Sequence, residues 1–352
     1  AFVLEADLGV RWLTTDDTWQ ATVLDGWGAT AGHGVAGRGV ELLDTRSMPE
    51  DWATGGLTGR AVHRRASAVG EPGRATPPSY PIGPFGPRPI APLTARPVPF
   101  VDAGDGTWRT RGVVAGTLRV DLEGPAGATA TVRLAETMGA DGAPVPGEHD
   151  TSLRVVCDSG RRSVESVDRF GGQGALVTAD DGVVVHDVTV VERLYPVDGE
   201  AAFSCSDPLL DGIHRVGRRT VTLNSDDAYT DCPTREQRAW TGDSVVHQMV
   251  DLTTNDDWRL ARRNVSLVAG SRRPDGMLPM AVAGDAEDAD FTIIPDWALH
   301  WVHSVWNLYR YVGDRDEIGE LLPVVEGVLR WFEPFTDRAG LLRDVYGWVI
   351  ID

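Results

Sequence analysis

The first part of the chain shows a period of two in its apolar residues, which is typical of strands with one buried face. Apolar and polar side chains alternate in residues 118–122, residues 124–127 have the sequence Gly-Pro-Ala-Gly, and residues 130–134 alternate again. Two alternating runs on either side of a turn sequence predict a hairpin of an antiparallel β-sandwich. Residues 183–192 repeat the alternation and complete an all-β half of the chain.

The pattern changes after this half, where the apolar spacing becomes three and four. Asp207 followed by Pro208 is typical of a helix start, because aspartate caps free backbone N–H groups and proline fits the first turn. Leu210, Ile213 and Val216 then share one face of the predicted helix. Further helices are predicted over residues 244–252, 256–268, 297–311 and 318–332. The chain is therefore predicted to be an all-β half followed by an all-α half.

These patterns divide the chain into four segments. Residues 1–70 are predicted to form a β-rich N-terminal module, and residues 100–204 an antiparallel β-sandwich. Residues 71–99 contain ten of the 22 prolines. Proline can neither donate to a strand ladder nor continue a helix, so this segment is predicted to be an extended crossover or linker on the surface. Residues 205–352 are the predicted helical domain.

The charge composition excludes several functions. The chain has 52 acidic residues against 33 basic ones, a net charge of −19, and every basic residue is arginine. Chemistry that needs lysine, such as Schiff-base formation, is therefore excluded. We expect no nucleic-acid partner, because that needs a positive surface, and no membrane partner, because no apolar run approaches the ~18 residues that cross a bilayer. Three scattered cysteines favour neither a zinc site nor a disulfide framework, so we expect no metal and no cofactor.

The richest candidate for chemistry is residues 231–243, with the sequence Asp-Cys-Pro-Thr-Arg-Glu-Gln-Arg-Ala-Trp-Thr-Gly-Asp. If the chain becomes helical at Pro233, then Glu236, Trp240 and Asp243 lie on one face of the helix. Because acidic residues on one face repel one another, at least one of them is expected to have a raised pKa.

Asp231, just before this turn, can converge on the same point. Arg235 and Arg238 would keep the remaining acidic side chains ionised, while Trp240 supplies an apolar wall that raises the pKa of a neighbouring acid. One protonated carboxyl group beside ionised carboxylates is what glycoside hydrolysis requires.

A purely structural interpretation stays open on these residues alone. Asp231 could cap a helix at Pro233, Asp243 could cap the helix predicted from residue 244, and Glu236 with Arg235 could form a solvated surface.

The segment resembles the DCPxRE…WTGD signature of the α-L-rhamnosidases of glycoside hydrolase family 78. The resemblance implies β-sandwich modules followed by an (α/α)6-barrel catalytic domain, which agrees with the order of the two halves. Residues 274–279, Pro-Asp-Gly-Met-Leu-Pro, and residues 308–314, Leu-Tyr-Arg-Tyr-Val-Gly-Asp, resemble the same family.

By this resemblance, Glu236 is the general acid of a hydrolase that releases terminal α-L-rhamnose with inversion. The implied partner is a rhamnosylated small molecule or polysaccharide. Asp231 and Asp243 would bind rhamnose hydroxyl groups, Trp240 would wall the pocket, and Arg235 would orient the acids.

The resemblance adds three weaker site candidates and one departure. Trp348 stands where the family places another aromatic sugar contact, and Asp296 with Trp297 stands in place of the family's GWGD-like stretch. The family's general base lies later in the barrel, so we expect it beyond residue 352. Only about the first half of the barrel would then be present, and a longer chain or a second chain would supply the remainder.

Two other functions stay open. One is a non-catalytic carbohydrate-binding or scaffold protein, and the other is a helical-barrel glycosidase or lyase that acts on another sugar. The compartment, cytoplasmic or secreted, also stays open, with no signal peptide visible in the sequence.

Overall fold

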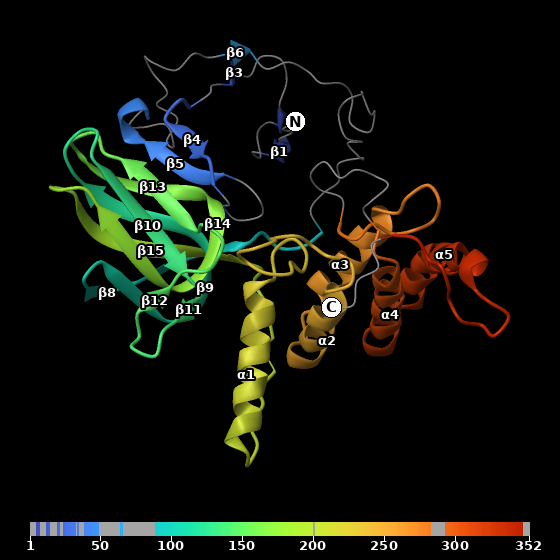
Figure 1. The fold of residues 1–352 in the computed structure, drawn as a ribbon. Coiled ribbons are helices and arrows are strands. Elements are labelled where there is room, and N and C mark those ends of the chain that lie inside the picture. Colours follow the sequence, from blue (N-terminus) through green and yellow to red (C-terminus); the bar gives the residue numbers. More distant parts are fainter. Residues whose placement is uncertain are drawn as a thin grey trace.

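The computed structural model describes residues 5–7, 12–14, 20–21, 24–32, 34, 39–48, 64–65, 89–199, 201–282 and 293–347. A sheet-rich region comes first and a helical region follows it, as the sequence predicts (Figure 1). No helix in the described part of the chain has the length and apolar character to cross a membrane.

The sheet-rich region is built around one nine-stranded sheet. Eight of its strands follow the order β4-β5-β13-β10-β14-β9-β15-β7, and β8 pairs with β9. All pairs are antiparallel except β5 with β13, which is parallel. The strands are β1 (Glu5–Asp7), β2 (Trp12–Thr14), β3 (Gln20–Ala21), β4 (Trp27–Thr30), β5 (Val40–Asp44), β6 (Arg64–Arg65), β7 (Thr94–Pro99), β8 (Val101–Gly104), β9 (Thr107–Glu123), β10 (Thr129–Ala135), β11 (Thr137–Met138), β12 (Pro144–Val145), β13 (Ser152–Val156), β14 (Arg161–Ala179) and β15 (Val184–Leu194).

The predicted alternation is confirmed, but the predicted hairpin is wrong. Leu118, Val120 and Leu122 of β9 are at most 1% exposed, and the apolar residues of β10 are equally buried. The two strands nevertheless do not pair, because β14 lies between them and pairs with both. A period of two fixes which face is buried and leaves the neighbouring strand open. The 19-residue β14 is long enough to pair with both strands.

One sheet unites strands from three of the predicted segments. The strands β4 and β5 come from the predicted N-terminal module, and β7 comes from the last six residues of the predicted linker. The linker expectation is therefore corrected for residues 94–99. The two prolines of β7 are tolerated because β7 is an edge strand that pairs with β15 alone. Residues 71–88 of the predicted linker lie outside the described residues.

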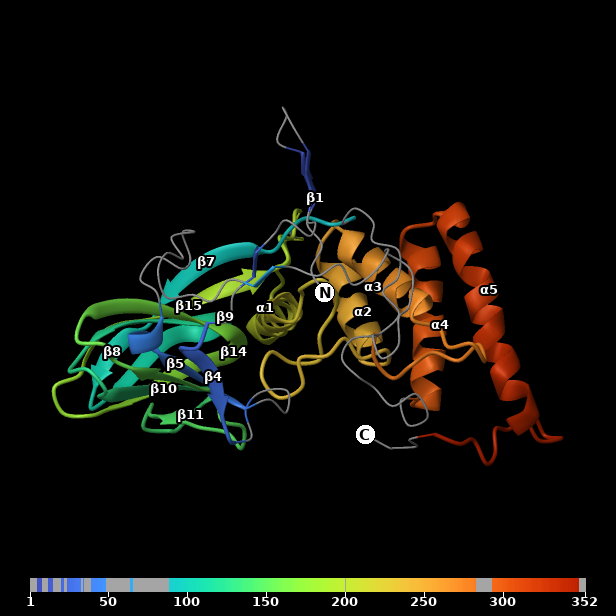
Figure 2. The same cartoon turned by 90° about the horizontal axis from the view of Figure 1, so that it is seen from above.

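The five predicted helices are present, with ends shifted by a few residues. They are α1 (Pro208–Leu223), α2 (Ser244–Thr254), α3 (Arg259–Gly270), α4 (Pro295–Tyr311) and α5 (Arg315–Phe332), with short 3-10 turns at Thr45–Ser47 and Glu333–Phe335. The Asp207 side chain accepts from the backbone N–H of Leu209, which is the predicted cap of α1. The helices α2 to α5 pack side by side around the buried Trp301 (Figure 2).

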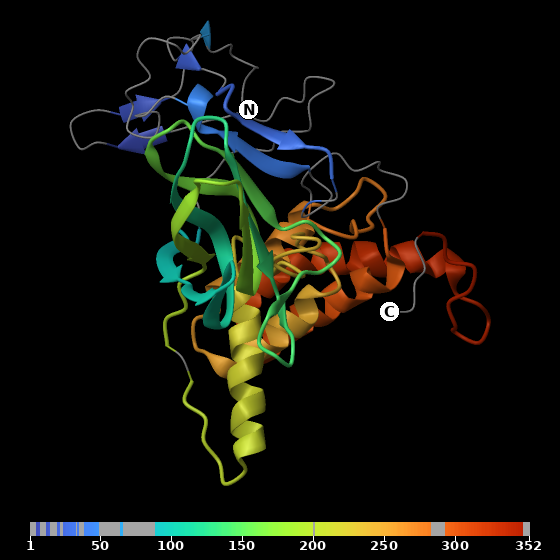
Figure 3. The same cartoon turned by 60° about the vertical axis from the view of Figure 1, so that its left-hand side comes forward.

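Helix α1 lies between the sheet and α2 (Figure 2). The buried carboxylate of Glu192 in β15 accepts from Arg219 of α1 at 2.5 Å and also pairs with Arg96 of β7. The N-terminal half of α1 extends past the sheet (Figures 1 and 3), so its apolar stripe is 48–61% exposed at Leu210, Ile213 and Val216.

The close contact of β9 with β15 gives a test of the sheet. A Cβ atom at Gly116 would overlap the backbone oxygen of Val191, whereas a Cβ atom at Gly112 would meet open space. We expect Gly116→Ala to lower the unfolding free energy by about 1–3 kcal/mol and Gly112→Ala to change it little. Thermal unfolding followed by circular dichroism measures both. Equal melting temperatures for the two variants would contradict the pairing of β9 with β15.

Candidate active site

The segment 231–243 lies between α1 and α2 and is not helical at Pro233, so the helical arrangement considered for it does not occur. Residues 233–236 form a turn, and Gln237 follows in the left-handed region with φ of 52°. The chain then runs extended, with Trp240 bridging to Ala281. Backbone N–H groups of the segment find partners across the loop instead of four residues back: Asp231 N–H donates to Arg238 O at 2.8 Å, and Thr241 N–H donates to Met280 O at 2.7 Å.

The three acidic side chains of this segment nevertheless come together. The pKa of Asp243 is raised to about 6, first by burial and then by the negative charge of Asp231. A hydrogen bond between the Asp231 and Asp243 side chains and the charge of Glu236 raise this pKa further. The expectation that one clustered acid has a raised pKa is confirmed, and that acid is Asp243.

Asp243 does not act as a helix cap. It precedes α2 with helical backbone angles, and its side chain makes no capping hydrogen bond. Its Oδ2 atom and the indole Nε1 of Trp240 are both buried with no hydrogen-bond partner among the described residues. An unpaired buried donor or acceptor costs about 1–3 kcal/mol, so each of these atoms favours a polar ligand.

Two tryptophans form an apolar wall beside these acids. The rings of Trp240 and Trp297 meet edge to face, with centroids 5.2 Å apart. Gly242 makes this possible, because a Cβ atom there would overlap the Trp297 ring. The Arg238 guanidinium lies 6.0 Å from the Trp240 centroid.

The remaining predicted site residues divide into three cases. The exposed guanidinium of Arg235 contacts one acid, Glu236, at 2.6 Å. Asp296 is exposed in the first turn of α4 and makes no hydrogen bond or ion pair with the acids among the described residues. Trp348 lies outside the described residues.

The sheet also contributes residues that the sequence prediction missed. The Thr234 hydroxyl bonds to Glu136, which follows β10, and the Gln237 amide donates to the backbone oxygen of Arg169 in β14 at 2.6 Å. These contacts join residues 68 and 98 positions apart, so no local pattern could have signalled them.

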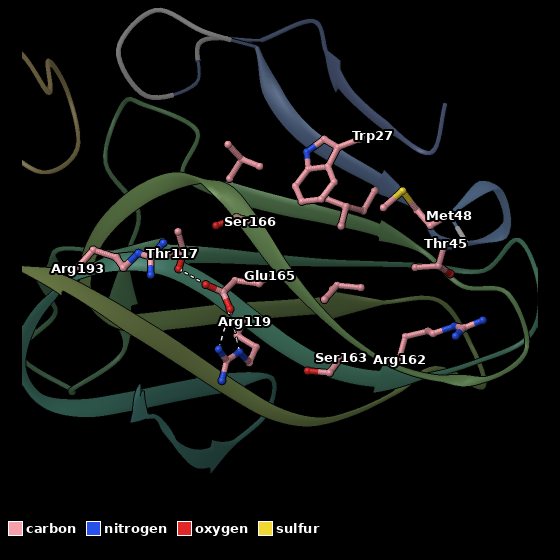
Figure 4. Close-up of a pocket in the computed structure, with 13 residues that line it drawn as sticks. Trp27, Thr45, Met48, Thr117, Arg119, Arg162, Ser163, Glu165, Ser166 and Arg193 are labelled. Carbon is pink, nitrogen blue, oxygen red and sulfur yellow. Dashed lines mark hydrogen bonds and ion pairs between the residues drawn. The ribbon is translucent and has the colours of Figure 1, made fainter. Parts of the chain in front are cut away.

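A cavity of about 550 Å³ in the sheet is a less suitable ligand site (Figure 4). Its central Glu165 accepts from the Thr117 hydroxyl at 2.5 Å and pairs with Arg119 at 2.7 Å. The indole of Trp27, which borders the cavity, donates to Glu41 at 2.8 Å. Polar groups that already have protein partners gain less from a ligand than the unpaired atoms of Trp240 and Asp243.

Within the described residues, no group of three or more His, Cys, Asp or Glu side chains could hold a metal ion.

Clustered carboxylates with tryptophans in the same segment, in a helical region preceded by a sheet, are features that carbohydrate-active hydrolases use. Residues 198–352 match the family profile described as the bacterial alpha-L-rhamnosidase 6 hairpin glycosidase domain. Less than half of the chain lies in this match, and over these residues the chain is similar to bacterial alpha-L-rhamnosidases.

Two curated relatives, both alpha-L-rhamnosidases, match the chain. The one from Formosa agariphila is 23% identical over 155 residues, which is 42% of this chain and 16% of the relative. The one from Streptomyces avermitilis is 25% identical over 245 residues, which is 66% of this chain and 23% of the relative. The chain therefore spans less than a quarter of either relative.

Solved structures show the same fold. The family 78 rhamnosidase of Bacillus sp. GL1 has a TM-score of 0.63 at 25% identity, covering 72% of this chain and 27% of that one. The Streptomyces avermitilis enzyme, complexed with L-rhamnose, has a TM-score of 0.72 at 20% identity, covering 93% and 31%.

The raised pKa of Asp243 predicts a pH-dependent stability. Its folded pKa, about 6, exceeds the unfolded value near 3.8, so the folded state holds the proton more tightly. Stability from this group is present below pH 3.8 and is lost as pH rises through 6. We expect wild-type protein to lose melting temperature relative to Asp243→Asn as the pH rises from 4 to 7. A constant difference between the two melting curves over this range would contradict the assignment.

Proposed function

We propose that the chain carries the first part of the catalytic domain of an inverting α-L-rhamnosidase that releases terminal α-L-rhamnose from glycosides or polysaccharides. The observation that carries the proposal is that Asp243 Oδ2 and Trp240 Nε1 are both buried with no hydrogen-bond partner among the described residues. Both atoms lie within the residues that match the rhamnosidase domain profile. Sugar hydroxyl groups donate and accept hydrogen bonds, so they suit both an acceptor such as Asp243 Oδ2 and a donor such as Trp240 Nε1.

In this proposal Glu236 is the general acid. It would donate its proton to the glycosidic oxygen as the bond to the leaving group breaks. To act in this way the Glu236 carboxyl group must be able to reach the glycosidic oxygen. The Arg235 side chain is 64% exposed, so it is free to leave Glu236 when the substrate enters.

The other residues bind and shape the sugar. Asp231 and Asp243, which share a hydrogen bond, would bind rhamnose hydroxyl groups. Trp240 and Trp297 would cover an apolar face of the ring and exclude water from the reacting bond. Asp296 and Trp348 stay predictions as substrate contacts.

An inverting hydrolase also needs a carboxylate that activates water across a gap of ~6.5–9.5 Å from the acid. That base stays a prediction, expected outside residues 1–352. We propose that α1 to α5 belong to an (α/α)6 barrel whose other helices come from the same polypeptide or from a second chain. The exposed stripe at Leu210, Ile213 and Val216 supports this, because exposed apolar patches mark surfaces that other elements cover.

Replacement of Glu236 tests the acid. In the natural full-length protein, Glu236→Gln is expected to lower kcat/KM for methyl α-L-rhamnoside by about 10²–10⁴-fold, because its leaving group needs a proton. The loss for a dinitrophenyl rhamnoside should be much smaller, and calorimetric binding of L-rhamnose should persist.

The control is Glu326→Gln, which changes an exposed carboxylate on α5 that is likewise paired with an arginine, Arg330. This control should leave both rates unchanged. A near-normal rate of Glu236→Gln on methyl rhamnoside would overturn the acid assignment.

A further inference from the structure

One residue of the sheet, Arg169, contacts both ends of the segment that carries Asp231 and Glu236. Arg169 lies in β14, where the register with β9 shifts between Glu165 and Arg169. Its side chain is only 14% exposed, although it belongs to a strand of the sheet and points to the helical region.

The guanidinium of Arg169 holds the beginning of the segment. Its Nη1 pairs with Asp226, and its Nη2 donates to the backbone oxygen of Leu223 at 2.5 Å, at the end of α1. Both partners are on the chain that leads from α1 to Asp231. An arginine with two separate acceptors fixes direction as well as distance.

The backbone oxygen of Arg169 holds the other end. It accepts from the Gln237 side-chain amide at 2.6 Å, and the same amide donates to Pro233 O at 2.8 Å. Gln237 directly follows Glu236 and adopts a φ of 52°, a region that non-glycine residues enter at a cost. The amide therefore closes the turn that presents Glu236 and ties it to β14.

Close packing keeps the turn against the strand. A Cβ atom at Gly171 of β14 would lie 2.8 Å from Pro233 Cγ and 2.8 Å from the Thr234 hydroxyl oxygen. The Thr234 hydroxyl group also donates to the side chain of Glu136, which follows β10. Any side chain at position 171 must push the turn away from the sheet.

We infer that β14 positions Glu236 through two contacts, the backbone oxygen of Arg169, which holds Gln237, and Gly171, against which the turn packs. The inference rests on the proposed function, because it says that the sheet fixes the position of Glu236, the proposed general acid. Misplacement of a reacting group by about 1 Å can cost 10²-fold in rate, so such support is needed for the reaction.

Direct removal of Arg169 is a poor test, because it leaves the buried Asp226 carboxylate unpaired and threatens folding. Two milder variants instead act on the contacts between β14 and the turn that bears Glu236. Gln237→Asn keeps an amide and suits positive φ, but is one carbon too short to reach Arg169 O. Gly171→Ala moves the turn by contact with Pro233 and Thr234. The control is Gly112→Ala on the neighbouring β9, where a Cβ atom meets nothing within 4 Å.

The readout is the leaving-group dependence of kcat/KM in the natural full-length protein. Gln237→Asn and Gly171→Ala are each expected to lower kcat/KM for methyl α-L-rhamnoside by about 10- to 100-fold. The dinitrophenyl rhamnoside, which departs without a proton, should be hydrolysed at nearly the wild-type rate, and Gly112→Ala should resemble wild type on both substrates.

Equal losses on the two substrates would mean that the variants only reduce the folded or binding-competent fraction, and would overturn the inference. Unchanged rates on both would overturn it as well. If wild-type protein released rhamnose from neither substrate, the proposed function itself would fail and this inference with it.

Discussion

Three carboxylates held around one partly buried point repel one another, and the surrounding structure must supply the energy that keeps them there. Burial and the charge of Asp231 raise the pKa of Asp243 to about 6, so a proton shared between the two acids relieves part of the repulsion. The guanidinium of Arg235 pairs with Glu236 at the open side. Since the chain contains no lysine, every fixed cation near this point is an arginine, which stays charged at any working pH.

Both the sheet and the helical region contact the segment that carries the three acids. The helical side supplies the tryptophan wall, made possible by the absence of a side chain at Gly242. The sheet side supplies Arg169 and Glu136, which contact the turn that bears Glu236. A rigid sheet that contacts an irregular loop can hold that loop in a single conformation, which the proton donor proposed at Glu236 would need.

Features that depend on local periodicity were predictable from the sequence. The order of sheet and helices, the five helices and the buried face of β9 all follow from spacing, cap residues and alternation. The pairing of β9 with β14 was not predictable. The strand β14 begins 38 residues after β9 ends, and alternation carries no information about which strand is the neighbour.

The candidate site was only partly predictable from the sequence. The acids converge as expected, yet through a turn at Pro233 and a left-handed Gln237 instead of a helix. At the end of this segment Thr241 donates to the backbone oxygen of Met280, 39 residues away, a contact that local helix propensity does not encode. The contacts of Arg169 have the same long-range character.

The most direct test of the central claim is the anomeric configuration of the first sugar released from an aryl α-L-rhamnoside by the natural full-length protein, followed by proton NMR before mutarotation. The account predicts that β-L-rhamnose appears first. The appearance of α-L-rhamnose first, or the release of no rhamnose, would contradict it.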